Sequence, residues 1–232
     1  MRVLSFQPLR LPLAAPLGLV IVLLLQVSPT VGCAGGCIAS TSQDPITAPP
    51  LAAVEGDGGI SLATRAYWMR QANLALPNPC PFAAFGSVVV NHTASAGLGE
   101  MVAIDNCSAI FVDPEGPFRM TPAEALAAFA DLTLYTNAES CPMCASAIRW
   151  AGFKEYVYGT SIDTLVEKGW GQINVNSSYI FAQSTGLPRQ TGLVGPVLTN
   201  ETDVFFSWQY VPDAPCPQGC SRDRDQGSCR PA

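Results

Sequence analysis

Apolar and polar positions along the chain fall into blocks whose spacing predicts helices and strands. Over residues 62–76, good helix formers with periodic apolar positions predict an amphipathic helix that ends before a proline. Residues 85–90 are short, β-branched and apolar, which is typical of a buried strand. Thr121 followed by Pro122 and Glu124 places a hydroxyl, a proline and a carboxylate where a helix begins, so a further helix is expected there.

The central block of the chain alternates strand and helix. Residues 132–136 predict a strand, 142–150 a helix and 155–160 another strand, which is the pattern of a βαβ unit. A short helix is expected at 178–184. The pattern therefore indicates an α/β fold, with one folded domain at 62–210.

The residues before this domain follow no helical or strand period. Positions 1–32 combine a basic start, an apolar run at 17–25 and small residues before Cys33, which are the parts of a secretory signal peptide. The apolar run is far shorter than the roughly 20 residues that span a bilayer as a helix, so no stable membrane anchor is expected. Residues 33–61 are rich in Gly, Pro, Ser and Ala and predict a flexible linker.

Sequons and cysteines also favour export. Four Asn-x-Ser/Thr triplets offer sites for N-glycosylation, at Asn91, Asn106, Asn176 and Asn200. The chain has nine cysteines, and an oxidising compartment would pair some of them. Within the Cys- and Pro-rich tail at 211–232, Cys216 is expected to pair with Cys220 or Cys229, or Cys220 with Cys229, while Cys80 is expected to be buried or bridged. A secreted, extracellular glycoprotein is the resulting expectation.

Charge narrows the class of ligand. Only 13% of residues are charged and the formal net charge is −6, so the chain has no basic surface of the kind that holds a long nucleic acid. A small-molecule partner is expected instead. A homo-oligomer is compatible with the sequence.

The pair Cys141 and Cys144 carries the clearest chemical signal. A helix beginning at Cys141 or Pro142 places both thiols in its first turn, where backbone N–H groups favour thiolates. Two cysteines at this spacing can bind one zinc ion, form a structural disulfide or act in redox chemistry. By spacing alone, the disulfide and redox interpretations are the more common.

The residues around this pair favour zinc. The segment Leu134-Tyr135-Thr136-Asn137-Ala138-Glu139-Ser140-Cys141-Pro142-Met143-Cys144-Ala145-Ser146-Ala147-Ile148 resembles the second motif of the cytidine-deaminase-like family, in its CMP/dCMP-type branch with guanine and tRNA-adenosine deaminases. Ser140 stands where that motif usually has proline. The resemblance covers about residues 62–210 and implies a three-layer α/β/α fold with a mixed central sheet. It also implies Zn²⁺ bound by Cys141 and Cys144, whose water attacks the ring carbon that bears the amino group.

The family's first motif, His-x-Glu, is degenerate in this chain. The single histidine, His92, follows the first predicted strand and is more easily understood as a surface residue than as a displaced ligand. One alignment puts Leu98 where the histidine belongs and Glu100 in the role of acid/base. A second alignment, which we favour because only nine residues separate Val90 from Glu100, reads 96–102 as a second strand and treats the His-x-Glu turn as deleted.

The sequence therefore predicts a zinc-dependent hydrolytic deaminase-like protein that acts on a nucleobase or nucleoside, with Cys141 and Cys144 as metal ligands and Glu100 as the catalytic acid/base. An inactive form is part of this prediction because the histidine is missing, although Cys107 could supply a replacement thiolate. Glu139 is assigned a structural role. The alternative is a non-catalytic secreted protein of the same fold, in which Cys141 and Cys144 form a disulfide or an incomplete metal site. A thiol oxidoreductase with Cys141 as nucleophile is a third interpretation.

Overall fold

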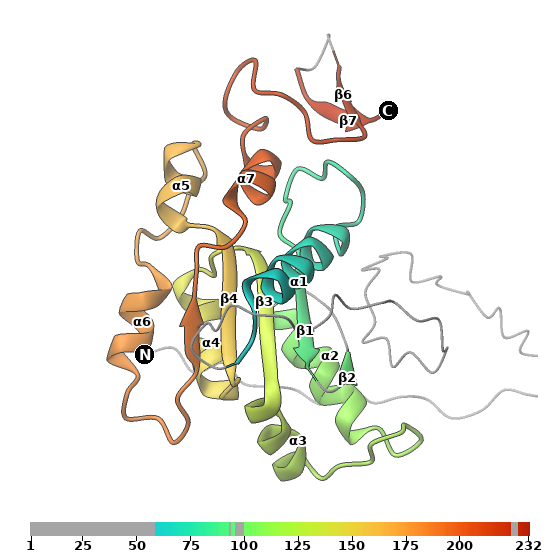
Figure 1. The fold of residues 1–232 in the computed structure, drawn as a ribbon, viewed down its shortest axis with the longest axis vertical. Helices are drawn as coiled ribbons and strands as arrows, with labels where there is room; N and C mark the ends of the chain where they lie inside the picture. Colours follow the sequence, from blue (N-terminus) through green and yellow to red (C-terminus); the bar gives the residue numbers. More distant parts are fainter. Residues whose placement is uncertain (1–58, 93, 96–99, 224–226) are drawn as a thin grey trace, which may run out of the picture. The chain divides into compact units, whose positions relative to one another are not determined.

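The computed structural model describes residues 59–92, 94–95, 100–223 and 227–232 (Figure 1). The expected signal peptide, most of the linker, Cys33 and Cys37 lie outside the described residues. All described residues belong to one compact unit, Cys33–Ala232. Among them, no helix combines the length and the apolar character needed to cross a membrane.

The described chain contains both helices and strands. In chain order they are α1 Leu62–Leu74, β1 Ser87–Asn91, β2 Ala94–Ser95, α2 Glu100–Val112, α3 Pro122–Ala128, η1 Phe129–Asp131, β3 Leu132–Ala138, α4 Pro142–Ala151, β4 Glu155–Thr160, α5 Ile162–Glu167, α6 Ser177–Gln183, β5 Gly192–Val194, α7 Thr199–Thr202, η2 Asp203–Phe206, β6 Cys220–Arg222 and β7 Cys229–Pro231.

The main sheet is mixed and has the strand order β2-β1-β3-β4-β5. β1 pairs with β3 in antiparallel fashion, whereas β3, β4 and β5 run parallel. The parallel pair β3 and β4 is joined by α4, as the βαβ pattern predicts. β3 is buried along its whole length, as expected for a central strand that is covered on both faces.

Helices cover both faces of this sheet (Figure 1). On one face, β-strand residues such as Val88 and Tyr135 pack with Met69 of α1. On the other face, neighbours in the strands such as Val89 and Leu134 pack with α2 and α4. The alternation of side chains along each strand produces these two apolar layers. The expected three-layer α/β/α fold with a mixed sheet is confirmed.

The segment between β1 and α3 differs from the favoured expectation. A strand was expected at 96–102, but Met101 and Val102 lie in α2, and the second strand is the two-residue β2, which pairs with the end of β1. α2 is helical because Ala103 and Cys107, one turn apart, both pack onto the sheet. A short second strand at Ala94–Ser95 and a helix from Glu100 therefore both follow β1.

The tail is attached to the domain by disulfides. Cys216 pairs with Cys229, one of the expected pairings, and this bond links the segment before β6 to the first residue of β7. Cys220 pairs with Cys80, so the expectation of a purely local pairing for Cys220 was wrong, whereas that of a bridged Cys80 is confirmed. Trp208 packs against both bonds, which makes the tail part of a small apolar cluster.

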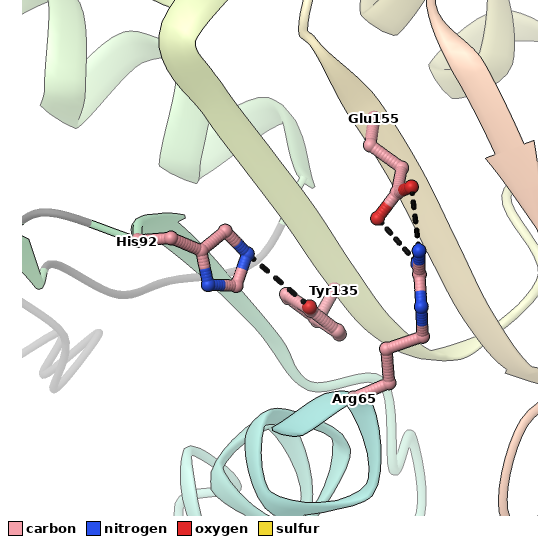
Figure 2. Close-up of polar contacts among 4 residues, drawn as sticks. All are labelled: Arg65, His92, Tyr135 and Glu155. Carbon is pink, nitrogen blue, oxygen red and sulfur yellow. Dashed lines mark hydrogen bonds and ion pairs between the residues drawn. The ribbon is translucent and has the colours of Figure 1, made fainter. Parts of the chain in front are cut away.

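A buried ion pair fastens α1 to the sheet (Figure 2). The guanidinium of Arg65 donates to both carboxylate oxygens of Glu155, the first residue of β4, with a distance of 2.9 Å from Nη2 to Oε1. Beside this pair, the Tyr135 hydroxyl lies 3.4 Å from Nε2 of His92. Burial first, and then the charge of Glu155, raise the pKa of Tyr135.

Removing one charge of this pair should be costly. We expect Glu155→Gln to lower the free energy of unfolding by about 3–5 kcal/mol, because the Arg65 charge stays buried without its counter-ion. Urea unfolding with the disulfides intact measures this loss. A matched control on the same helix is the exposed pair of Arg70 and Glu201, where Glu201→Gln should cost less than about 1 kcal/mol. Equal losses would contradict the role of burial.

Candidate functional site

The two motif cysteines lie at the carboxyl end of β3, in the first turn of α4. Cys141 is the N-cap residue of α4, Pro142 occupies the first helical position and Cys144 follows within the same turn. Both cysteines are partly exposed, and Cys141 carries a free thiol. No disulfide therefore joins Cys141 to Cys144, which removes the disulfide form of the alternative interpretation. The helix start expected from the sequence is confirmed.

The residue two places before Cys141 holds this end of the sheet together. Glu139 is buried, and its carboxylate accepts one hydrogen bond from the backbone N–H of Ile162 at 2.9 Å and another from that of Ser177 at 2.6 Å. These are the first residues of α5 and α6, whose N-terminal N–H groups need acceptors. The structural role expected for Glu139 fits these contacts.

Neighbouring polar groups fix the segment that leads into α4. The backbone N–H of Ser140 donates to the Tyr156 hydroxyl at 2.7 Å, and the N–H of Glu139 donates to the carbonyl of Thr160. Asn137 donates from Nδ2 to the carbonyl of Ala84 and accepts from the N–H of Gly86, both at 2.8 Å. Sequence reasoning missed the role of Asn137, although an amide at the end of an apolar strand is a signal for it.

Gly86 explains why α1 can lie close to this segment. A Cβ at Gly86 would fall 2.2 Å from the backbone oxygen of Ala72 in α1. Only glycine permits this approach, because any side chain would collide with helix backbone. The start of β1 is thereby held both by α1 and by Asn137.

Glu100 is the first residue of α2, and its side chain lies outside the described part. At the other end of α2, Phe111 packs against Phe129, just before β3 begins, with ring centroids 6.0 Å apart. α2 also contacts α4. α2 therefore covers the same face of the sheet as α4.

His92 lies at the opposite end of the sheet. It follows Asn91, which pairs with Leu132 at the start of β3, whereas Cys141 comes after the end of that strand. The seven residues of β3 span roughly 20 Å at about 3.3 Å per residue. Burial first, and then the charges of Lys154 and Arg65, lower the pKa of His92. His92 is therefore not a ligand partner of the cysteines.

The described residues do not provide the protein ligands of a complete catalytic zinc site. Such sites have three protein ligands, and within the described ranges no group of three His, Cys, Asp or Glu side chains could hold a metal ion. Cys107 is buried among apolar residues between α2 and the sheet, and it does not form such a group with Cys141 and Cys144. The structure thus brings the two cysteines together and adds no third ligand among the described residues.

Comparison with known proteins gives structural likeness only. No protein-family model and no curated protein matches the chain. A guanine deaminase from Nitrosomonas europaea is similar at 16% identity over 63% of this chain and 82% of that chain, with a TM-score of 0.42. A mutant protein in complex with 8-azaguanine matches at 15% identity, 65% and 84% coverage and a TM-score of 0.43. A complex with 2,6-diaminopurine matches at 16% identity, 66% and 82% coverage and a TM-score of 0.40. At these values the assignment of function rests on this chain's own residues.

The role of Glu139 is testable by a neutral isostere. We expect Glu139→Gln to lower the free energy of unfolding by about 2 kcal/mol. The amide N–H of glutamine would lie opposite one of the two buried backbone N–H groups, which would then lack an acceptor. Urea unfolding gives the loss, and faster hydrogen exchange at the amides of Ile162 and Ser177 should accompany it. Glu167→Gln, at an exposed position of α5, is the control and should change stability by less than about 0.5 kcal/mol. A loss in the control as large as in Glu139→Gln would refute this assignment.

Proposed function

We propose that this chain is a deaminase-like protein of the class that acts on a nucleobase or nucleoside, and that this form is hydrolytically inactive because its zinc site is incomplete. The observation that carries the proposal is the position of Cys141 and Cys144, in the first turn of a helix at the carboxyl end of a parallel strand. Ligands of open α/β sheets bind at this edge. The motif around the cysteines resembles the metal-binding half of that class.

The proposed zinc site is incomplete because the histidine of the family motif is missing. The family motif requires His-x-Glu, and this chain has Leu98-Gly99-Glu100 at the matching position. A leucine side chain offers no lone pair to a metal ion, whereas Cys141, Cys144 and Glu100 keep the residue types that the motif requires. An active enzyme is the second candidate, and the start of α2 at Glu100 supports it, because the resemblance implies an acid/base at the start of a helix.

One substitution separates these candidates. We expect the full chain to hold less than one zinc per molecule and to release no ammonia from guanine, cytidine or adenosine. Leu98→His should restore tight binding of one zinc per chain, measured by metal analysis, and ammonia release from at least one of these substrates. Leu98→Ala is the matched control and should restore neither. Adding Cys144→Ser to Leu98→His should abolish zinc binding.

A second double variant tests Glu100. Glu100→Gln combined with Leu98→His should keep the zinc and lower ammonia release by roughly 100-fold or more, as expected for loss of a general acid/base. Zinc and ammonia release in the unmodified chain would support the active enzyme. If Leu98→His gains neither zinc nor activity, the assignment of Leu98 to the histidine position is wrong. Reduction of insulin disulfides by the unmodified chain would favour the oxidoreductase.

We also propose that the protein enters the secretory pathway. The signal-like segment at 1–32, the four sequons and the two disulfides support this, since such bonds form in oxidising compartments. We expect the full chain, expressed in eukaryotic cells, to appear in the medium with a mobility shift on removal of N-linked glycans. A variant lacking residues 2–32 should stay in the cytosol, unglycosylated. Retention of the full chain in the cytosol would contradict the proposal.

A further inference from the structure

Two adjoining grooves lie at the C-terminal half of α4. One has a volume of about 230 Å³ and lies between α4 and α6, and the other, of about 180 Å³, lies between α4, α3 and the segment before β5. Arg149, Trp150 and Leu187 line both grooves. Cys141 precedes Arg149 by eight residues, or roughly 12 Å of helix, so the grooves are separate from the cysteine pair.

Arg149 brings a buried positive charge to both grooves. It is 2% exposed, and its guanidinium donates to the hydroxyl and carbonyl oxygens of Ser184 and to the Thr191 hydroxyl at 2.7–2.9 Å, and to Oε1 of Gln190 at 3.3 Å. The guanidinium also lies over the Phe181 ring, 5.4 Å from its centroid. All four acceptors are neutral, and one N–H group of Nη1 has no acceptor among the described residues.

The charge of Arg149 has no counter-ion in the described part of the chain. A buried guanidinium normally pairs with a carboxylate, as Arg65 does with Glu155. Burial lowers the pKa of Arg149. Arginine nevertheless stays protonated at physiological pH, so it cannot avoid this cost by losing its proton. An anion in the adjoining groove would offset the cost of burying the charge.

A second cation lines the groove beside α3. Arg189 donates through Nη1 to the carbonyl of Ala127 at 2.7 Å, and it forms no ion pair with a described carboxylate. Its stem packs on Gly152, the left-handed C-cap of α4, where a Cβ would lie 2.9 Å from Cδ of Arg189. Glycine therefore allows the stem to cross the end of α4, and the guanidinium keeps further N–H groups for a ligand.

The remaining walls of the grooves are largely apolar. Trp150 is 72% exposed, and Leu126, Leu187 and Pro188 line the groove beside it. Among the described residues, no Asp or Glu lines either groove. Apolar walls pack against the hydrocarbon part of a ligand, whereas guanidinium groups bind carboxylate or phosphate oxygens. The two kinds of surface together suit a ligand that has both parts.

We propose that these grooves bind a small organic anion, namely a carboxylate or a phosphate monoester that carries an apolar or aromatic group. The anionic group pairs with Arg189 and with the open N–H group of Arg149, and the apolar group packs against Trp150. This binding uses none of the cysteine-site residues. It is therefore independent of the proposed function, and either proposal can fail without the other.

Isothermal titration calorimetry of the full chain with phenyl phosphate and with benzoate tests the proposal. A chelator in the buffer prevents metal at the cysteine pair from binding the anion. We expect one molecule per chain with a Kd of roughly 1 mM or tighter for at least one of the two probes. Tryptophan fluorescence should change in parallel because Trp150 lies at the site. The tighter probe identifies the anionic group, since both carry the same phenyl ring.

Two further compounds separate the parts of the ligand. Benzyl alcohol has the ring without the charge, and inorganic phosphate has the charge without the ring. Each should bind at least roughly 10-fold more weakly than the better probe, because each makes only one kind of contact. Binding of benzyl alcohol as tight as that of the anions would overturn the proposal.

Substitutions at the two arginines locate the site. Arg189→Met removes one charge and keeps an apolar stem, and it should weaken binding by roughly 10-fold or more. Arg149→Lys keeps a charge but loses the planar fork, and it should weaken binding as well. Arg119→Met is the matched control, since Arg119 is exposed, donates to a backbone carbonyl and lines neither groove. It should leave binding unchanged.

Circular dichroism shows whether each variant is folded, and binding is compared only among folded variants. The two arginine variants are independent, so either one that folds provides the test. Failure of the full chain to bind both phenyl phosphate and benzoate would overturn the proposal. Binding that the folded arginine variants leave unchanged would also overturn it.

Discussion

The carboxylate of Glu139 accepts N–H groups from the first residues of α5 and α6, and the arrangement of the whole carboxyl edge follows from this contact. Two helices that begin in the interior would otherwise bury unsatisfied donors, at a cost of about 1–3 kcal/mol each. Because Glu139 also pairs its own N–H with the end of β4, strand and helices meet immediately before Cys141. These backbone hydrogen bonds therefore fix the segment that carries the cysteine pair.

Contacts elsewhere support the same framework. The two sides of the sheet are held by apolar burial, and α1 is held to the sheet by a buried ion pair. Burial of apolar surface supplies most of the stability of such a domain. The framework that carries the cysteine pair therefore rests on these contacts.

Elements with strong local signals could be predicted from the sequence, and elements that depend on distant contacts could not. The capping box at Thr121 and Glu124 and the proline after Cys141 mark helix starts that the structure contains. The short α5 has no distinctive period and depends on Glu139, which lies 23 residues before its first residue. The pairing of Cys80 with Cys220 could not be predicted from the sequence either, because cysteine spacing does not identify a partner 140 residues away.

The disulfide between Cys80 and Cys220 makes most of the folded chain part of one covalent ring. Cys80 precedes the first strand and Cys220 lies in the terminal hairpin, so the ring contains the whole main sheet and the helices between its strands. In the chain-entropy description, a loop of this length restricts the unfolded chain by about 5 kcal/mol. It also means that a protease cutting one surface loop inside the ring opens the backbone without releasing a fragment. In an extracellular setting, such a molecule keeps its full mass after a cut, and only reduction separates the pieces.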